Sequence, residues 1–162
     1  MSRQQHRLYG DPKRFDAVAD FIEERFNGQI RYIADVAGGM GVLTRLLSKK
    51  NFACELIDPR RTVLKGITHR PEKFRVEMAD YYDLLVGLHP DGALRELGEA
   101  ALIRPAVMIP CCNFWDDQRR GQRELLEAIE DFYRQHAVQF ERVVLDFKGP
   151  KNIAIVSEPP RE

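Results

Sequence analysis

The sequence lacks the features of several large classes of protein: it has few cysteines, no excess of charge and no long apolar run. Only three cysteines occur in 162 residues; two are adjacent, and none has the spacing of a zinc site. This pattern argues against a disulfide framework and indicates reduced thiols, so we expect a cytoplasmic protein. The first residues are polar, and no run approaches the roughly 20 apolar residues that cross a bilayer, so we expect neither a secretion signal nor a membrane partner.

The charge is balanced, with 25 basic and 25 acidic residues. A neutral total does not point to a polyanionic partner, although a local basic face can still bind one. Two such stretches occur; they comprise Arg3, Arg7, Lys13 and Arg14, and then Arg60, Arg61, Lys65, His69, Arg70 and Lys73. Each is either a solvated face or a surface for RNA, which would bind through residues 1–10 and the Arg60/Arg61 region.

The sequence does contain an alternation of apolar strands and amphipathic helices. Residues 1–10 predict a mobile N-terminal arm, and residues 11–162 predict one domain whose first helix starts with Asp11 as N-cap and Pro12. Further helices are predicted after the glycine turn described below, over 91–103 and over 122–136. The predicted strands span 32–36, 52–57, 74–78, 84–88, 106–109, 140–147 and 152–156.

The most informative stretch runs from Ile33 to Gly41 and is completed by the strand that ends at Asp58. It indicates a buried strand, a glycine turn, a helix, a second strand and an acid at the end of that strand. This order builds a nucleotide-binding half of an open α/β sheet, in which Gly39 and Gly41 allow a tight turn and a close approach to the ligand. Asp58 is then placed to accept hydrogen bonds from a ribose diol. The alternative is an exposed turn acid before Pro59.

Over nearly its whole length, the chain resembles the class I S-adenosylmethionine-dependent methyltransferases. The glycine motif of that family is an acid, one spacer and three glycines at alternate positions, which Asp35, Ala37, Gly39 and Gly41 match with alanine in place of the first glycine. The resemblance implies a Rossmann-like three-layer α/β sandwich. Its sheet would have seven mostly parallel strands and end in a C-terminal antiparallel β-hairpin.

The resemblance also implies S-adenosyl-L-methionine as cofactor and S-adenosyl-L-homocysteine as product. A carboxylate at the end of an apolar strand needs a partner, and the ammonium of the methionine moiety would suit Asp35. Asp80 would accept from the adenine amino group with Tyr81 over the ring, unless Asp80 only caps a short turn. The implied cofactor-binding residues are Asp35, Ala37, Gly38, Gly39, Gly41, Asp58, Pro59, Asp80 and Tyr81.

Two further segments, Val86 to Ala93 and Ile109 to Trp115, resemble a branch of the family that includes tRNA ribose methyltransferases. This chain has Asp91 where that branch often has cysteine, and Asn113 where it has histidine or tyrosine. The candidates for catalysis are His89, Asp91 and Asn113. His89 is a general base, a substrate contact or a structural residue, and Asp91 alternatively caps the following helix.

The segment after the fifth predicted strand offers a wall for the substrate. Phe114 and Trp115 would stack a planar acceptor such as a base, or else form a hydrophobic plug over the end of the sheet. Cys111 and Cys112 predict no metal site, because adjacent side chains at a strand end point in opposite directions.

These patterns together predict an enzyme, a methyltransferase that acts on RNA or, less favoured, on a small molecule or a protein. A non-catalytic subunit that binds the cofactor or serves as a scaffold is the alternative. A dehydrogenase shares the glycine motif, but 162 residues leave no room for a second nucleotide-binding half and a substrate domain.

Overall fold

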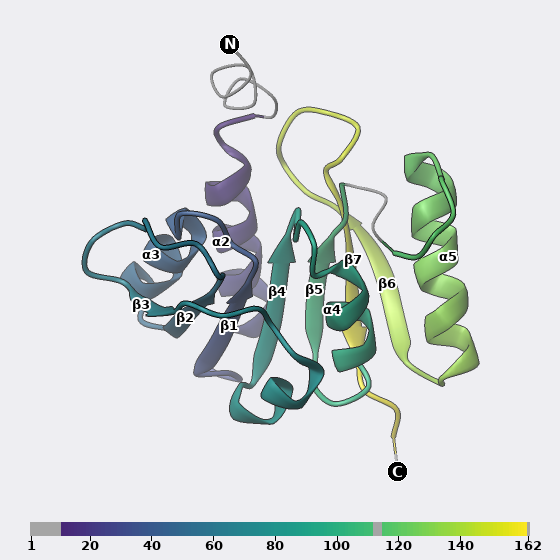
Figure 1. Cartoon of the computed structure of the whole chain (residues 1–162), viewed down its shortest axis with the longest axis horizontal. Coiled ribbons are helices and arrows are strands. Elements are labelled where there is room, and N and C mark those ends of the chain that lie inside the picture. The colour runs from purple at the N-terminus through teal and green to yellow at the C-terminus, as the bar shows by residue number, and fades with distance from the viewer. Residues whose placement is uncertain (1–10, 112–114, 162) are drawn as a thin grey trace.

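The computed structural model describes residues 11–111 and 115–161, which form a seven-stranded sheet with helices on both faces (Figure 1). Strands β1 to β5 are parallel, whereas β7 is antiparallel to both of its neighbours, β5 and β6. The predicted sheet with its C-terminal antiparallel hairpin is therefore confirmed. The strands, in the spatial order β3-β2-β1-β4-β5-β7-β6, are β1 (Tyr32–Val36), β2 (Ala53–Ile57), β3 (Thr68–Arg70), β4 (Leu84–Leu88), β5 (Ala106–Ile109), β6 (Gln139–Val144) and β7 (Ile153–Glu158).

Alternate side chains of the buried strands enter two separate cores. In β5, Ala106 and Met108 pack with the helices of one face, while Val107 and Ile109 pack with those of the other. The first core contains α4 (Leu94–Ala100), α5 (Gln122–Gln135) and the 3₁₀ helix η1 (Val76–Tyr81). The second contains α2 (Arg14–Phe26) and α3 (Val42–Lys49). In the described part of the chain, no helix has the length and apolar character to span a membrane.

The third strand is not where the sequence predicted it. Residues 74–78 do not form a strand; instead, Thr68–Arg70 pairs with β2, and η1 follows. The error has a physical cause, because β3 is a three-residue polar strand at the sheet edge and carries no apolar alternation. Phe74 and Met78 are both buried in one core and are four residues apart, a spacing that suits a helical turn.

Two predicted helix starts also lie too early. Helix α2 begins at Arg14, and Asp11 belongs to the turn before it, where its Oδ1 accepts the amide of Lys13 at 3.0 Å. Helix α4 begins at Leu94, so Asp91 does not cap it; Asp91 lies in a turn in which Gly92 has φ +76°. The mobile arm stays a prediction, because residues 1–10 lie outside the described residues.

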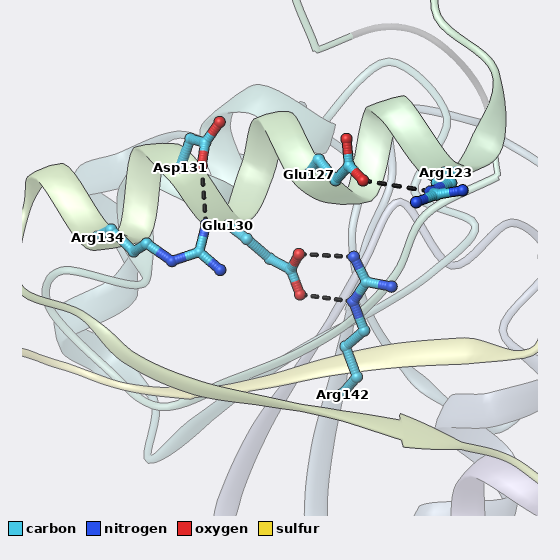
Figure 2. Close-up of polar contacts among 6 residues, drawn as sticks. All are labelled: Arg123, Glu127, Glu130, Asp131, Arg134 and Arg142. Atoms are coloured by element: carbon cyan, nitrogen blue, oxygen red, sulfur yellow. Dashed lines mark hydrogen bonds and ion pairs between the residues drawn. The ribbon is translucent and has the colours of Figure 1, made fainter.

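An ion pair between a buried carboxylate and a partly exposed arginine joins α5 to the edge strand β6 (Figure 2). The Arg142 guanidinium donates to both carboxylate oxygens of Glu130 at 2.6 Å, and only 6% of the Glu130 side chain is exposed. The pair between Arg134 and Asp131 on the same helix is 60% and 63% exposed. The two pairs should differ in their contribution to stability. An exposed pair adds little, whereas a buried carboxylate that loses its partner is costly.

We predict that Arg142→Met lowers the free energy of unfolding by about 1–2 kcal/mol, less than a fully buried pair would give because the arginine is itself partly exposed. The matched control Arg134→Met removes an exposed arginine of the same region and should change the value by less than about 0.5 kcal/mol. Urea titration at neutral pH measures both. Equal losses of unfolding free energy in the two variants would contradict a larger contribution of the Glu130–Arg142 pair.

Candidate cofactor-binding site

The candidate site lies at the carboxyl edge of the sheet, where β1, β2, β4 and β5 end together. The strand order grows outward in opposite directions from the β1–β4 pair, so a crevice is expected beyond the ends of these two strands. The glycine turn follows β1, Asp58 follows β2, and His89 follows β4. The loop between β6 and β7 rises beyond the same edge (Figure 1).

The glycine turn is tight and needs residues without a bulky side chain. Gly39 and Gly41 have φ of +69° and +94°, a region that favours glycine. Gly38 is required for another reason, because a Cβ there would overlap the carboxylate of Asp35. Ala37, which replaces the first glycine of the family motif, also has a positive φ of +53°. The turn therefore holds a left-handed alanine, which costs about 1–2 kcal/mol.

Asp58 bonds directly to this turn. Its Oδ2 accepts the amide of Gly39 at 2.9 Å, and its Oδ1 accepts the amide of Arg60 at the same distance. The Arg60 guanidinium lies close by, with Nε 3.4 Å from Oδ1. The Asp58 carboxylate thus ties the end of β2 to the glycine turn, and exposed Pro59 follows it. This contact of Arg60 was not identified from the sequence, although the two residues are only two positions apart.

Asp35 is fully buried and only half satisfied. Thr44 of α3 donates its hydroxyl to Oδ2 at 2.8 Å, but Oδ1 has no hydrogen-bond partner in the described part of the chain. Burial raises the pKa of Asp35 to about 6; the Thr44 bond opposes the rise, and the nearby charge of Asp58 adds to it. A buried oxygen without a partner is suited to a donor or a cation brought by a ligand. Thr44 was not identified as a site residue from the sequence, although a threonine among the buried residues of α3 indicates a hydroxyl with a buried partner.

Asp80 and Tyr81 lie at the opposite edge of the sheet. Both belong to η1, and Arg104, just before β5, donates to the Asp80 carbonyl at 3.3 Å and lies 3.5 Å from its carboxylate. Asp83, which follows η1, accepts the amide of Tyr32 at the start of β1. The expectation that Asp80 and Tyr81 contact adenine rested on the wrong third strand, and their place at the amino edge does not fit it.

His89 adopts a left-handed backbone conformation at the end of β4, with φ +50°. Its ring Nε2 lies 3.1 Å from the carbonyl oxygen of Lys151 in the β6–β7 loop. Because a carbonyl only accepts, Nε2 carries the hydrogen and Nδ1 carries the lone pair. Burial lowers the pKa of His89, and the charges of Arg14 and Lys151 lower it further, against the opposing Lys151 bond. The side chain of Asp91 is exposed nearby, and its amide donates to the His89 carbonyl at 2.8 Å.

Trp115 is buried in the core. Its side chain is 4% exposed and meets the Phe132 ring at 5.4 Å between centroids, with the Arg95 guanidinium 4.5 Å from its own centroid. This placement favours the hydrophobic plug over the substrate wall. The predictions for Cys112, Asn113 and Phe114 lie outside the described residues. Within the described ranges, no three His, Cys, Asp or Glu residues gather as metal ligands.

The raised pKa of Asp35 predicts how stability depends on pH. The folded state binds the proton more tightly than the unfolded state, so this group stabilises the fold below pH 4 and loses that contribution as pH rises through about 6. The shift from 3.8 to about 6 corresponds to roughly 3 kcal/mol. We therefore expect the unfolding free energy of the wild type to fall by up to this amount relative to Asp35→Asn between pH 4 and pH 7. Denaturation at each pH measures both proteins. A difference in unfolding free energy between wild type and Asp35→Asn that stays constant from pH 4 to pH 7 would contradict the prediction.

The comparisons with known proteins agree with this geometry at the level of the fold. No family model matches the chain, and no curated protein matches it in sequence. Among solved structures, a candidate S-adenosyl-L-methionine-dependent methyltransferase from Methanococcus maripaludis matches with a TM-score of 0.65 at 14% identity, over 92% of this chain and 86% of its own. The sugar N-methyltransferase KedS8 from a Streptoalloteichus species matches with 0.59 at 14% identity, over 93% and 88%.

A candidate rRNA methylase from Clostridium thermocellum matches with a TM-score of 0.57 at 14% identity, over 91% of this chain and 96% of its own. Identities this low show the fold alone, and these proteins differ in what their names say they modify. The narrower resemblance to tRNA ribose methyltransferases stays a prediction. The chain therefore has the Rossmann-like fold of the class I S-adenosylmethionine-dependent methyltransferases.

Proposed function

We propose that this protein is a methyltransferase that uses S-adenosyl-L-methionine and releases S-adenosyl-L-homocysteine. The observation that carries the proposal is the fully buried Asp35, whose Oδ1 has no partner in the described residues and which lies beside a glycine turn at the point where the strand order reverses. An ammonium group from a ligand would pair with that oxygen. It would also hold the carboxylate ionised at neutral pH against the effect of burial.

The residues of the carboxyl edge fit the rest of the same cofactor. Asp58 offers both carboxylate oxygens beside the turn, although the Arg60 guanidinium has to move aside for a ribose diol to approach Oδ1. Gly38, Gly39 and Gly41 leave three positions of the turn without a side chain. When bound, the cofactor supplies a methyl group that its sulfonium charge makes easy to transfer. The protein then contributes alignment of the acceptor and, for a hydroxyl acceptor, removal of a proton.

His89 is the group that we assign to the proton. The Lys151 carbonyl holds the imidazole with Nδ1 as acceptor, and burial lowers the pKa of His89, which favours the neutral ring. A neutral imidazole at the end of β4 has the properties of a general base, and a strained backbone at such a position is common in functional sites. Asp91 and Asn113 remain candidates for catalysis beside His89.

RNA is the acceptor that we favour, and a small molecule or a protein would be the next. Basic side chains support this choice on two sides of the site. Arg14 and Lys151 impose positive charge on His89, while exposed Arg60 and Arg61 follow Asp58. Cations in these positions would bind phosphates of a nucleic acid next to the transferred methyl group.

Calorimetric titration with S-adenosyl-L-homocysteine tests the cofactor. We expect the compound to bind, NAD to bind far more weakly, and Asp58→Ala to weaken binding by about 10- to 100-fold, as the loss of a charge-assisted hydrogen bond does. Asp80→Ala is the matched control. It removes an exposed aspartate at the opposite edge of the sheet and should leave the affinity unchanged. An equal loss in both variants, or no binding by the wild type, would overturn the cofactor assignment.

Transfer of a labelled methyl group to total cellular RNA, with protein and metabolite pools in parallel, tests the reaction and the base. We expect His89→Asn to lower the rate by about 10²- to 10⁴-fold, as removal of a general base does. In the wild type, kcat/KM should rise with pH through a pKa below 6.5, because the neutral imidazole is the active form. Cofactor binding without transfer to any pool would instead favour the non-catalytic subunit.

A further inference from the structure

The loop that joins β6 to β7, residues Leu145 to Asn152, is built to hold its shape. Leu145 donates its amide to the Asn152 carbonyl at 2.8 Å, and the Asn152 side chain donates back to the Phe147 carbonyl at 3.0 Å. The side chains of Leu145 and Phe147 are buried in the same core as α2. The base of the loop is therefore fixed, whereas Lys148, Gly149 and Pro150 at its tip are exposed.

Two contacts attach this loop to the rest of the carboxyl edge. The Lys151 carbonyl oxygen accepts a hydrogen bond from Nε2 of the His89 ring at 3.1 Å. Lys148 donates its amide to Oδ2 of Asp11 at 2.9 Å, over a sequence separation of 137 residues. The other oxygen of Asp11 accepts the Lys13 amide at 3.0 Å, and its carbonyl accepts the Arg14 amide. One carboxylate thus fastens the loop tip to the turn from which α2 starts.

We propose that Asp11 is a positioning residue of the methyl-transfer site: by holding the Lys148 amide, it fixes the loop whose Lys151 carbonyl orients the His89 ring. Asp11 acts through the backbone of the loop and touches neither cofactor nor acceptor. The role of His89 in catalysis rests on the proposed function, but the control of its ring by Asp11 does not.

The geometry explains why this tie is needed. Lys151 is separated from Lys148 only by Gly149, which has φ +118°, and by Pro150, which has no amide hydrogen. Without the Asp11 bond the tip would gain freedom, and the Lys151 carbonyl would move with it. A hydrogen bond at 3.1 Å weakens steeply when its acceptor is displaced or misaligned. His89 would then lose both its fixed orientation and part of its shielding from water.

The charges around His89 guide the choice of variants. The charges of Arg14 in α2 and Lys151 in the loop both lower the pKa of His89. Asp11 contacts Arg14 directly and contacts the loop at Lys148. Asp11→Ala removes the charge and both acceptor oxygens, whereas Asp11→Asn removes the charge but keeps one acceptor oxygen, which can serve either the Lys148 amide or the Lys13 amide. Asp11→Asn should therefore keep part of the tie that Asp11→Ala loses. Asp16→Ala, an exposed acid in the first turn of the same helix, is the matched control.

The experiment is NMR on the full chain without ligand. Hydrogen exchange of the Lys148 amide should be about tenfold faster in Asp11→Ala than in the wild type, since a charge-assisted bond is lost. The ring signals of His89 and the pKa read from them should shift in Asp11→Ala, because weakening of the Lys151 bond removes an interaction that raises this pKa, while entry of water reduces the burial that lowers it; the shift should be smaller in Asp11→Asn. The Asp16→Ala protein should match the wild type in both measurements.

The same variants then enter the methyl-transfer assay. We expect Asp11→Ala to lower kcat with no change in KM for the cofactor, and Asp11→Asn to recover part of the loss. Faster exchange at Lys148 with an unchanged His89 titration would overturn the inference, because the loop would then move without affecting the ring. NMR changes as expected in a protein that transfers no methyl group would instead leave the inference standing and overturn the proposed function.

Discussion

The site depends on one constraint, which is that β1 pairs with strands on both sides and is covered by helices on both faces. A strand in this position has no solvent side, so each of its inner side chains is forced into the protein. Asp35 stands in that strand and is therefore buried whether or not a partner exists for both of its oxygens. Thr44 satisfies one oxygen from α3, and the second is left facing the glycine turn that follows β1. A carboxylate kept in such a place reduces stability unless a ligand compensates for it.

Four non-glycine residues of the described chain have a positive φ; Asn51 and Ala137 follow helices α3 and α5, and the other two lie at the same edge of the sheet as Asp35. Ala37 after β1 and His89 after β4 both take left-handed conformations without being glycine, and β1 and β4 are neighbours. Each costs free energy that the surrounding packing has to supply. At both positions the chain leaves its strand at the carboxyl edge, where the strand order predicts a crevice. Strain, the half-satisfied Asp35 and the order reversal of the sheet therefore coincide at one place, which is why that place is the strongest candidate for a ligand.

What the sequence predicted well was local, and what it missed was long-range. The turn from Asp35 to Gly41 and the acid at Asp58 could be predicted, because one strand, one turn and one crossover determine where they lie. The third strand could not, since three polar residues at a sheet edge owe their conformation to pairing with β2 and not to any pattern of their own. Asp80 was misplaced by the same error. The bonds of Asp11 to Lys148 and of Glu130 to Arg142 join elements that no periodicity connects.

The same contrast between local and long-range contacts divides the candidate site into a cofactor part and an acceptor part. The half assigned to the cofactor is encoded within 24 consecutive residues, Asp35 to Asp58, whose contacts with one another are short in sequence. The half assigned to the acceptor is assembled from the start of α2, the end of β4 and the C-terminal hairpin, through contacts that span 62 and 137 residues. A fold shared at 14% identity preserves the arrangement of strands that builds the first half, but it does not constrain the loops that build the second. The acceptor is consequently to be sought in the geometry around His89 and the β6–β7 loop, where this chain's own side chains, and not its likeness to other proteins, set the chemistry.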